Sequence, residues 1–369
     1  LDDNTLTDSC AKELSFALST NQSLTFVNLG SNNLTDSGVK LLFAALRNPD
    51  CKIQILRLYS NALTDSCAED LSSTLSTNRS LTDLELGINK LGDSGVKLLS
   101  AALKNPDCKI QKLGLNDTAL TASCAEDLAS MLGTNQSLTD LDLGSNKLGD
   151  SGVKLLSVAL RNPGCKIQKL RLPENDLSES CAEELSSTLN INRSLTDLEL
   201  GINKLGDSGV KLLSVALRNP DCKVQKLGLY NNTLTDSCAG DLSSALGINQ
   251  SLTNLNVGNN KLGDSGMKLL SVALTNPDSK IQKLELDMNY FTDSCVGSLT
   301  SALRTNQSLK SLSLGENLFT DQSVPALRDL ILTSKNLEMM RLEGNRFSAD
   351  GRNQLISLQG YRPGLMVTV

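Results

Sequence analysis

Short stretches of this chain alternate leucine with polar residues. In residues 81–87, LTDLELG, the alternation predicts a strand whose Leu84 and Leu86 face the interior while Asp83 and Glu85 face solvent. One such strand cannot bury its own apolar side, so the pattern points to a sheet assembled from several copies.

A longer apolar stripe with helical spacing follows the strand. In residues 91–106, LGDSGVKLLSAALKNP, apolar side chains including Val96 and Leu99 recur on one face and predict a helix. We expect Asp93 or Ser94 to cap its start. The Asn-Pro pair at the end of the stretch stops the helix, because proline cannot continue the hydrogen-bond ladder.

The turn between strand and helix carries an asparagine, Asn89, whose short side chain can bond backbone groups that the turn leaves unpaired. A second type of helix occurs at 120–138, LTASCAEDLASMLGTNQSL, where Ser123 and Glu126 fit a capping box.

The whole pattern repeats along the chain. Aligned against itself, the sequence shows an offset of 57 residues, and each 57-residue unit divides into halves of 28 and 29 residues with the pattern L-x-x-L-x-L-x-x-N-x-L. The twelve full matches start at Leu24, Ile53, Leu81, Ile110, Leu138, Ile167, Leu195, Val224, Leu252, Ile281, Leu309 and Leu337. The chain opens on the later part of a repeat, and a strand-like tail follows at 365–369. A fixed period of this length is the signature of a solenoid.

Stacked repeats place their strands in one continuous parallel sheet, about 4.8 Å apart. Helices are wider than strands, so we predict an α/β horseshoe with the sheet on the concave face and the helices on the convex face. We expect residues 1–369 to form a single solenoid of 12 to 13 repeats. Residues 309–369 diverge from the pattern, which is typical of terminal capping repeats.

Composition narrows the classes of partner. The net charge is −6 and the pI is near 5.0, which argues against general binding to nucleic acid or anionic membranes. The chain has no apolar run near the roughly 18 residues of a membrane span. Its start lacks the basic and apolar regions of a signal peptide. We therefore expect neither a nucleic-acid nor a membrane partner.

The ten cysteines occur at regular intervals, and the chain has no histidine. The nearest cysteines in sequence are sixteen residues apart, whereas a zinc site needs closely spaced ligands. Equivalent cysteines lie two repeats apart, about 10 Å, which exceeds the reach of a disulfide. A pairing of Cys108 with Cys124 stays open on distance. The pattern favours free, buried thiols in a reducing, cytoplasmic compartment, with no metal or cofactor.

Nine N-x-[ST] sequences would suit a glycosylated extracellular protein. Six of them are one helix-end position copied every 57 residues, so they amount to a single observation. The nine asparagines are Asn21, Asn33, Asn78, Asn116, Asn135, Asn192, Asn231, Asn249 and Asn306.

The sequence offers few combinations of residues that could form a catalytic site. Without histidine there is no imidazole base and no Ser-His or Cys-His pair. Carboxylate pairs such as Asp83 and Glu85 recur in several repeats, whereas an enzyme needs one site. We therefore predict that the chain is not an enzyme.

The repeated blocks NPxCKIQKLxL, LTxxCAxDLxxxL and LxDSGVKLLxxAL resemble ribonuclease-inhibitor-type leucine-rich repeats. They are most similar to the C-terminal repeat domain of NOD-like receptors of the pyrin-containing subgroup and their vertebrate relatives. The resemblance covers essentially the whole chain. It implies a leucine-rich-repeat horseshoe that recognises a protein or macromolecular ligand. In those innate-immune receptors it also helps to restrain an adjacent nucleotide-binding domain.

No G-x-x-x-x-G-K-[ST] phosphate loop, the mark of such a nucleotide-binding domain, occurs in this chain. Two alternatives stay open. One is a ribonuclease-inhibitor-like enzyme inhibitor, although the sequence has no Trp and only four Tyr to anchor a tight interface. The other is an extracellular or engineered binding scaffold, because residues 80–115 and 194–229 differ at only three positions.

The outward strand positions alternate between acidic and basic repeats. They can form cross-strand ion pairs or a striped surface for a charged partner. A few apolar and aromatic side chains depart from this alternation and are candidate anchors. The candidate contact residues on the concave face are Phe26, Ile55, Arg57, Tyr59, Asp83, Glu85, Asp140, Asp142, Lys169, Arg171, Asp197, Glu199, Tyr230, Met339 and Arg341.

Overall fold

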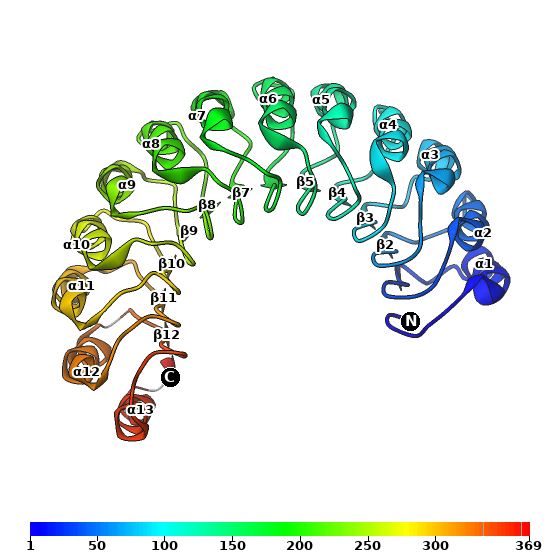
Figure 1. Ribbon diagram of the computed structural model, residues 1–369. Helices are drawn as coiled ribbons and strands as arrows, with labels where there is room; N and C mark the ends of the chain where they lie inside the picture. Colours follow the sequence, from blue (N-terminus) through cyan, green and yellow to red (C-terminus); the bar gives the residue numbers. More distant parts are fainter. Residues whose placement is uncertain (335, 363) are drawn as a thin grey trace. The chain divides into compact units, whose positions relative to one another are not determined.

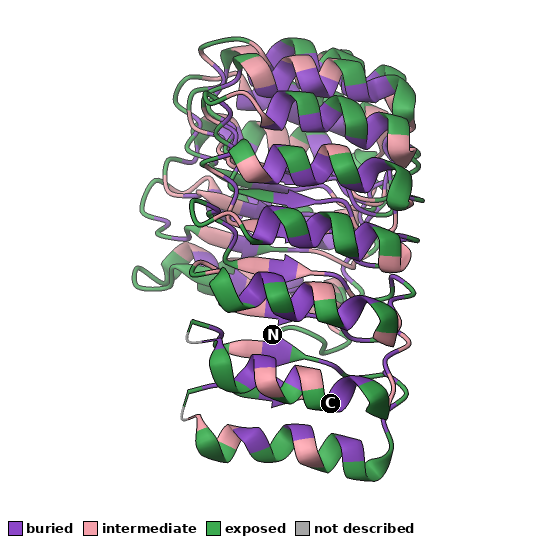
Figure 2. Cartoon of the chain, turned by 90° about the vertical axis from the view of Figure 1, so that its left-hand side faces the viewer, coloured by how far each residue is buried: buried purple, intermediate pink, exposed green. Residues whose placement is uncertain are grey.

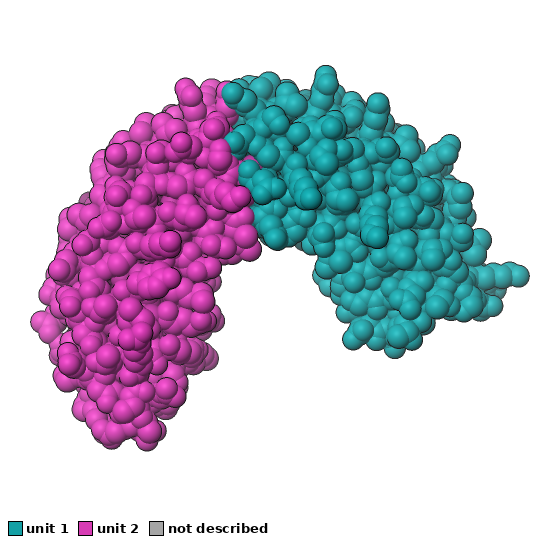
Figure 3. Space-filling view, in the orientation of Figure 1, with its two compact units in different colours: residues 1–176 teal, residues 177–369 magenta. Residues whose placement is uncertain are grey.

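The computed structural model describes residues 1–334, 336–362 and 364–369. The chain forms two compact units, unit 1 from Leu1 to Asp176 and unit 2 from Leu177 to Val369. Figure 3 colours them separately. Each unit is an array of strand–helix repeats, and each is described by itself below.

Every strand is three residues long and pairs in parallel with the next strand of its unit. Unit 1 contains β1 (Phe26–Asn28), β2 (Ile55–Arg57), β3 (Asp83–Glu85), β4 (Lys112–Gly114), β5 (Asp140–Asp142) and β6 (Lys169–Arg171). Unit 2 contains β7 (Asp197–Glu199), β8 (Lys226–Gly228), β9 (Asn254–Asn256), β10 (Lys283–Glu285), β11 (Ser311–Ser313), β12 (Met339–Arg341) and β13 (Met366–Thr368).

The helices of each unit lie together along one side of its strands (Figure 1). Unit 1 contains α1 (Ala11–Thr20), α2 (Asp36–Leu46), α3 (Ala68–Thr77), α4 (Gly92–Leu103), α5 (Ala125–Thr134) and α6 (Gly149–Leu160). Unit 2 contains α7 (Ala182–Ile191), α8 (Gly206–Leu217), α9 (Asp236–Ile248), α10 (Gly263–Leu274), α11 (Asp293–Thr305), α12 (Val324–Thr333) and α13 (Ala349–Ile356). Short 3-10 helices are η1 (Asp8–Cys10), η2 (Asp65–Cys67), η3 (Ala122–Cys124), η4 (Glu179–Cys181), η5 (Asp321–Ser323) and η6 (Ser357–Tyr361).

The core of each unit lies between its strands and its helices. Leu84 and Leu86 are fully buried, whereas Asp83 and Glu85 are only partly covered, as the alternation predicts. Figure 2 shows bands of buried residues alternating with exposed ones along the helices. The predicted α/β leucine-rich-repeat solenoid is therefore confirmed within each unit. The single-domain organisation of residues 1–369 stays a prediction.

The turn asparagine ties neighbouring repeats together. The Asn89 amide nitrogen donates to the carbonyls of Leu58, Leu86 and Gly87 at 2.8–3.2 Å. Its side-chain oxygen accepts from the backbone N–H groups of Asn61 and Leu63. The predicted role of Asn89 in satisfying turn backbone is confirmed, and the bonds reach into the preceding repeat.

The predicted helix caps are wrong. Helix α4 begins at Gly92 after Leu91, which makes no side-chain cap. Asp93 instead accepts hydrogen bonds from the N–H (2.8 Å) and the hydroxyl (2.5 Å) of Thr121 in the next repeat. Thr121, not Ser123, supplies the cap of the second type, because its hydroxyl accepts from the Ser123 N–H at the start of η3, which leads into α5. The local sequence pattern predicts that Asp93 caps its own helix, but its carboxylate instead bonds the neighbouring repeat.

The helix-end N-x-[ST] positions are structural. The Asn135 amide nitrogen donates to the carbonyl of Leu103 at 2.6 Å, and its oxygen accepts from the N–H groups of Ser137 and Leu138. Asn78 and Asn249 make the same set of bonds, and both are buried. The nitrogen that would carry a glycan is occupied at these positions.

All ten cysteines are free thiols, and nine of them are buried. The thiol of Cys124 donates to the carbonyl of Thr121 at 3.2 Å. Burial, followed by the negative charge of Asp93, raises the pKa of Cys124 to about 12. Burial likewise raises the pKa of Cys67 to about 12, with Asp36 as its charged neighbour. The prediction of buried thiols is confirmed except at Cys10, which is half-exposed.

We expect iodoacetamide at pH 8 to alkylate Cys10 of the native protein and to leave the other nine cysteines unmodified over the same interval. Only the thiolate reacts, and burial denies the reagent access to all nine of these thiols. At Cys67 and Cys124 the raised pKa also removes the thiolate. Peptide mass spectrometry after timed quenching measures this directly, with urea-unfolded protein as the control in which all ten react. Rapid modification of Cys124 in the native protein would contradict the packing described here.

Candidate functional site

The strand face of each unit carries two rows of side chains, one from the first and one from the third residue of every strand. Strands pair residue by residue, so the members of a row within a unit are direct neighbours. The first row is Phe26, Ile55, Asp83, Lys112, Asp140 and Lys169 in unit 1, and Asp197, Lys226, Asn254, Lys283, Ser311, Met339 and Met366 in unit 2. The third row is Asn28, Arg57, Glu85, Gly114, Asp142 and Arg171 in unit 1, and Glu199, Gly228, Asn256, Glu285, Ser313, Arg341 and Thr368 in unit 2.

All candidate contact residues except Tyr59 and Tyr230 lie in these two rows. Their exposure differs widely. Phe26 is 45% exposed, whereas Asp197 is 8% exposed and lies buried beside the lysine that pairs with it. The rows bring the candidates together within each unit.

First-row ion pairs follow one rule. Three of the four lysines in the row pair with the aspartate of the strand before them, in Lys112–Asp83 (3.1 Å), Lys169–Asp140 (3.4 Å) and Lys226–Asp197 (3.4 Å). The predicted cross-strand ion pairs are therefore confirmed at these strands. Each such pair contributes a few tenths to about 1 kcal/mol, because the lysines stay in contact with water.

The third row of unit 1 brings two carboxylates together across a glycine. A Cβ at Gly114 would collide with the carboxylate of Glu85, so this glycine leaves room for Glu85 to lie across β4. Burial raises the pKa of the Glu85 carboxyl, the charge of Asp142 raises it further, and Arg57 and Arg171 oppose the shift. The result is a compact charged cluster rather than a pair of isolated acids.

The tyrosines lie flat over glycines of the preceding repeat. The ring of Tyr59 covers Gly30 and the ring of Tyr230 covers Gly201. In each case ring atoms lie within 2.8 Å of the place that a Cβ atom would occupy if the glycine were another residue. The Tyr59 hydroxyl donates to the carboxylate of Asp2 at 2.8 Å, and this bond raises the pKa of the tyrosine. Both rings are half-exposed, so each offers one face for a contact.

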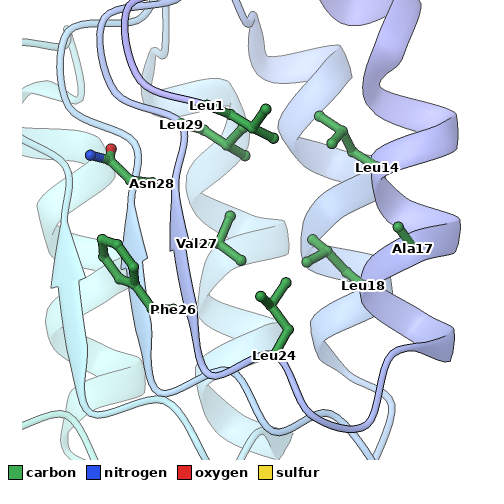
Figure 4. Close-up of a pocket in the computed structure, with 9 residues that line it drawn as sticks. All are labelled: Leu1, Leu14, Ala17, Leu18, Leu24, Phe26, Val27, Asn28 and Leu29. Atoms are coloured by element: carbon green, nitrogen blue, oxygen red, sulfur yellow. The ribbon is translucent and has the colours of Figure 1, made fainter.

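The N-terminal edge of unit 1 adds an apolar pocket of about 320 Å³ between α1 and β1. In Figure 4, Ala17 and Leu18 of α1 face Val27, whereas Phe26 points away from the helix. The Arg57 guanidinium lies 5.3 Å from the centre of the Phe26 ring, within cation–π range. This edge therefore combines aliphatic, aromatic and cationic groups.

A polar pocket lies on the strand face of unit 2, over β9. Its charged and amide lining is Glu199, Lys226, Asn254, Asn256, Lys283 and Glu285. Sequence reasoning did not single out this pocket. The signal for it is present in the 57-residue alignment, in which Asp83, Asp140 and Asp197 correspond to Asn254.

Within residues 1–334, 336–362 and 364–369, no group of three or more His, Cys, Asp or Glu side chains is arranged to hold a metal ion. Among the same residues, no helix is long and apolar enough to cross a membrane.

The loops after the strands contain residues in left-handed backbone conformation. Ile88 (φ 56°) and Ile202 (φ 52°) are β-branched and exposed, whereas the equivalent loops use Ser145 (φ 51°) and Asn259 (φ 51°). A β-branched side chain strains this conformation, and asparagine tolerates it.

We expect Ile202→Asn to raise the free energy of unfolding by about 1 kcal/mol, because it relieves left-handed strain at a side chain that is 40% exposed. Urea denaturation followed by circular dichroism measures the change. Ile248→Asn is the matched control, since Ile248 is also an exposed isoleucine but ends helix α9 with ordinary backbone. An equal gain from both variants would show that exposure, rather than strain, is responsible.

Comparison with known proteins places these repeats among characterised ones. A family model described as "Leucine Rich repeat" matches residues 20–43, 77–100, 134–157, 192–214 and 249–271. The sequence is 44% identical over 297 residues to NACHT, LRR and PYD domains-containing protein 3 of Homo sapiens, covering 80% of this chain and 29% of that protein. It is 45% identical over 288 residues to protein 14 of the same series from Homo sapiens, covering 78% and 26%. The chain thus spans less than a third of these relatives.

Solved structures agree on the fold alone. An internalin from Listeria monocytogenes superposes with a TM-score of 0.53 at 20% identity, covering 98% of this chain and 94% of that one. A chain of the yeast Rad7–Elc1 complex gives a TM-score of 0.53 at 16% identity, with coverage of 98% and 88%.

Proposed function

This chain is a leucine-rich-repeat domain related to those of the NACHT, LRR and PYD domains-containing proteins, and from this relationship we propose that it is the sensor or autoinhibitory domain of an intracellular NOD-like receptor. The observation that carries the proposal is the 44% identity over 297 residues to a protein that also contains a NACHT domain. On this proposal the chain works by recognition, without catalysis, in the cytoplasm.

The chemistry of the strand face supports recognition of a protein. The strand face of each unit carries paired charges, an amide and a half-exposed aromatic ring, and such mixed surfaces are typical of protein interfaces. Charged groups are repeated from strand to strand, whereas a catalytic centre occurs once. The free, buried thiols suit a reducing compartment.

The proposed partner of the first row is the nucleotide-binding domain that the relatives carry beside their repeats, or a ligand that competes with it. The acidic and basic side chains of the first row alternate at strand spacing, so a partner with the opposite alternation gains several contacts at once. Helix-face lysines such as Lys97 and Lys154 are exposed without this ordered pairing with strand aspartates.

The test is a titration of this chain against the Homo sapiens NACHT, LRR and PYD domains-containing protein 3 truncated before its own repeats. We expect binding, and we expect the double variant Lys112→Glu/Lys169→Glu to weaken it at least tenfold. The matched control Lys97→Glu/Lys154→Glu makes the same charge change on helices α4 and α6 and should stay within twofold. Absence of binding, equal loss in both variants, or inhibition of a ribonuclease at nanomolar concentration would each contradict the proposal.

A further inference from the structure

The first-row charge pattern of unit 2 is interrupted at β9. Elsewhere in the rows an aspartate precedes each lysine, as in Asp197–Lys226. At β9 the position holds Asn254, which is in direct register with Lys226 on one side and Lys283 on the other. Two lysines therefore flank a neutral residue, whereas the equivalent positions Asp83, Asp140 and Asp197 hold a carboxylate.

Lys283 shows the consequence of this exchange. Without an aspartate on the preceding strand, its ammonium group turns to Glu285 on its own strand at 2.7 Å. The equivalent position holds Gly114 in β4 and Gly228 in β8. Glu285 therefore acts as a substitute partner that the other lysine-bearing repeats do not need.

The Asn254 side chain is half-buried on the floor of the polar pocket. No hydrogen bond to its side-chain amide occurs among residues 1–334, 336–362 and 364–369, whereas the neighbouring Asn256 oxygen accepts from the N–H of Gly258 at 2.9 Å. Asn254 thus presents a hydrogen-bond donor at the position from which a carboxylate has been removed.

We infer that the carboxylate of an aspartate or glutamate in a partner protein binds over Asn254, between the ammonium groups of Lys226 and Lys283. The inference rests on the proposed recognition function and specifies one of its contacts. A partner carboxylate placed there completes the alternation that Asp83, Asp140 and Asp197 complete from within the chain in the other repeats.

Strand spacing supports this geometry. Neighbouring strands lie about 4.8 Å apart, so a group above Asn254 is within reach of both lysine side chains. Each ammonium group has three donors, so Lys226 and Lys283 can each bond a partner carboxylate while they stay paired with Asp197 and Glu285. The partner carboxylate then gains two charge-assisted hydrogen bonds in addition to the one from the Asn254 amide. Glu199 and Glu285 also line the pocket, and their charges disfavour the denser negative charge of a phosphate or a nucleic acid. A single carboxylate is therefore the best match.

The test measures binding of a fluorescein-labelled hexaglutamate peptide by fluorescence polarisation in low salt. We expect Asn254→Asp to weaken binding at least tenfold, because it restores the missing carboxylate from within the chain. Asn28→Asp is the matched control, with the same charge change on the strand face of unit 1. Asn28 and Asp142 both accept from the glycine N–H two residues on, so the control keeps its local bond. It should stay within twofold.

A second pair of variants distinguishes binding at the Asn254 pocket from non-specific attraction of the peptide to positive charge. Lys283→Gln should weaken binding at least fivefold, whereas Lys97→Gln, which removes an exposed lysine of helix α4, should stay within twofold. Thermal melting of each variant checks that it is folded, and Asn254→Asp should melt no lower than the parent chain.

Three results would overturn the inference: no hexaglutamate binding, equal effects of Asn254→Asp and Asn28→Asp, or tighter binding of an eight-residue oligothymidylate that responds to Asn254→Asp. The titration against the truncated receptor uses variants of Lys112 and Lys169, and it therefore tests the strand face of unit 1. Failure of the hexaglutamate test alone therefore removes this contact and leaves the proposed function standing.

Discussion

Replacing Asn260 with alanine is expected to lower the free energy of unfolding by about 3–5 kcal/mol. The Asn260 amide nitrogen donates to the carbonyls of Leu229, Val257 and Gly258 at 3.0–3.1 Å. Its oxygen accepts from the N–H groups of Asn232 and Leu234 at 2.9 and 3.0 Å. The residue is buried, so alanine leaves five backbone groups without these partners in a site with little access to water.

Urea denaturation followed by circular dichroism measures this loss, and hydrogen exchange of the β8 and β9 amides locates it. Asn254→Ala is the matched control, because it removes the same side chain from a half-buried position in β9, outside the turn. We expect that variant to stay within about 0.5 kcal/mol of the parent. A loss below about 1 kcal/mol for Asn260→Ala would show that the asparagine ladder contributes little to stability.

Replacing Arg362 with methionine is expected to destabilise the C-terminal repeats by about 2–4 kcal/mol. The guanidinium donates to the carbonyls of Ile331 (2.6 Å), Ser334 (2.5 Å) and Leu337 (2.9 Å). Ile331 lies in the last turn of α12, and the other two residues follow that helix. Hydrogen bonds from a charged donor are stronger than neutral ones, and a cation at a helix C-terminus is favourable. Methionine keeps most of the apolar stem and removes these donors.

Hydrogen exchange of the β12 and β13 amides is the sensitive measurement for this variant, because an end repeat can unfold locally. Arg352→Met is the matched control on α13, where the arginine is exposed. Faster exchange in both variants, or in neither, would contradict a capping role for Arg362. A selective effect of Arg362→Met would support the prediction that residues 309–369 form the C-terminal cap.

The sequence pattern predicts those features that repeat with the period of the solenoid. Leu84 and Leu86 are buried and Asn89 bonds the turn because each is dictated by strand alternation or by backbone groups that need partners. The helix caps could not be predicted in the same way. Asp93 looks like a local cap, but its carboxylate bonds Thr121 of the next repeat, and only the stacking of repeats brings these two groups together.

The candidate site shows the same division. The first-row ion pairs follow from alternating charge at strand spacing, and the structure contains them. The orientation of Tyr59 and Tyr230 over glycines depends on how one repeat packs on the next. The pocket at Asn254 is defined by a departure from the repeat, and its charge arrangement depends on the pairing of Lys283 with Glu285, which the repeat pattern does not predict.

We propose that this chain is the repeat domain of a receptor with a nucleotide-binding domain, and the decisive measurement is the sequence of the complete transcript that contains this coding region. We expect one reading frame that encodes a domain with a G-x-x-x-x-G-K-[ST] phosphate loop before the repeats. A complete reading frame that encodes these repeats and no nucleotide-binding domain would contradict it.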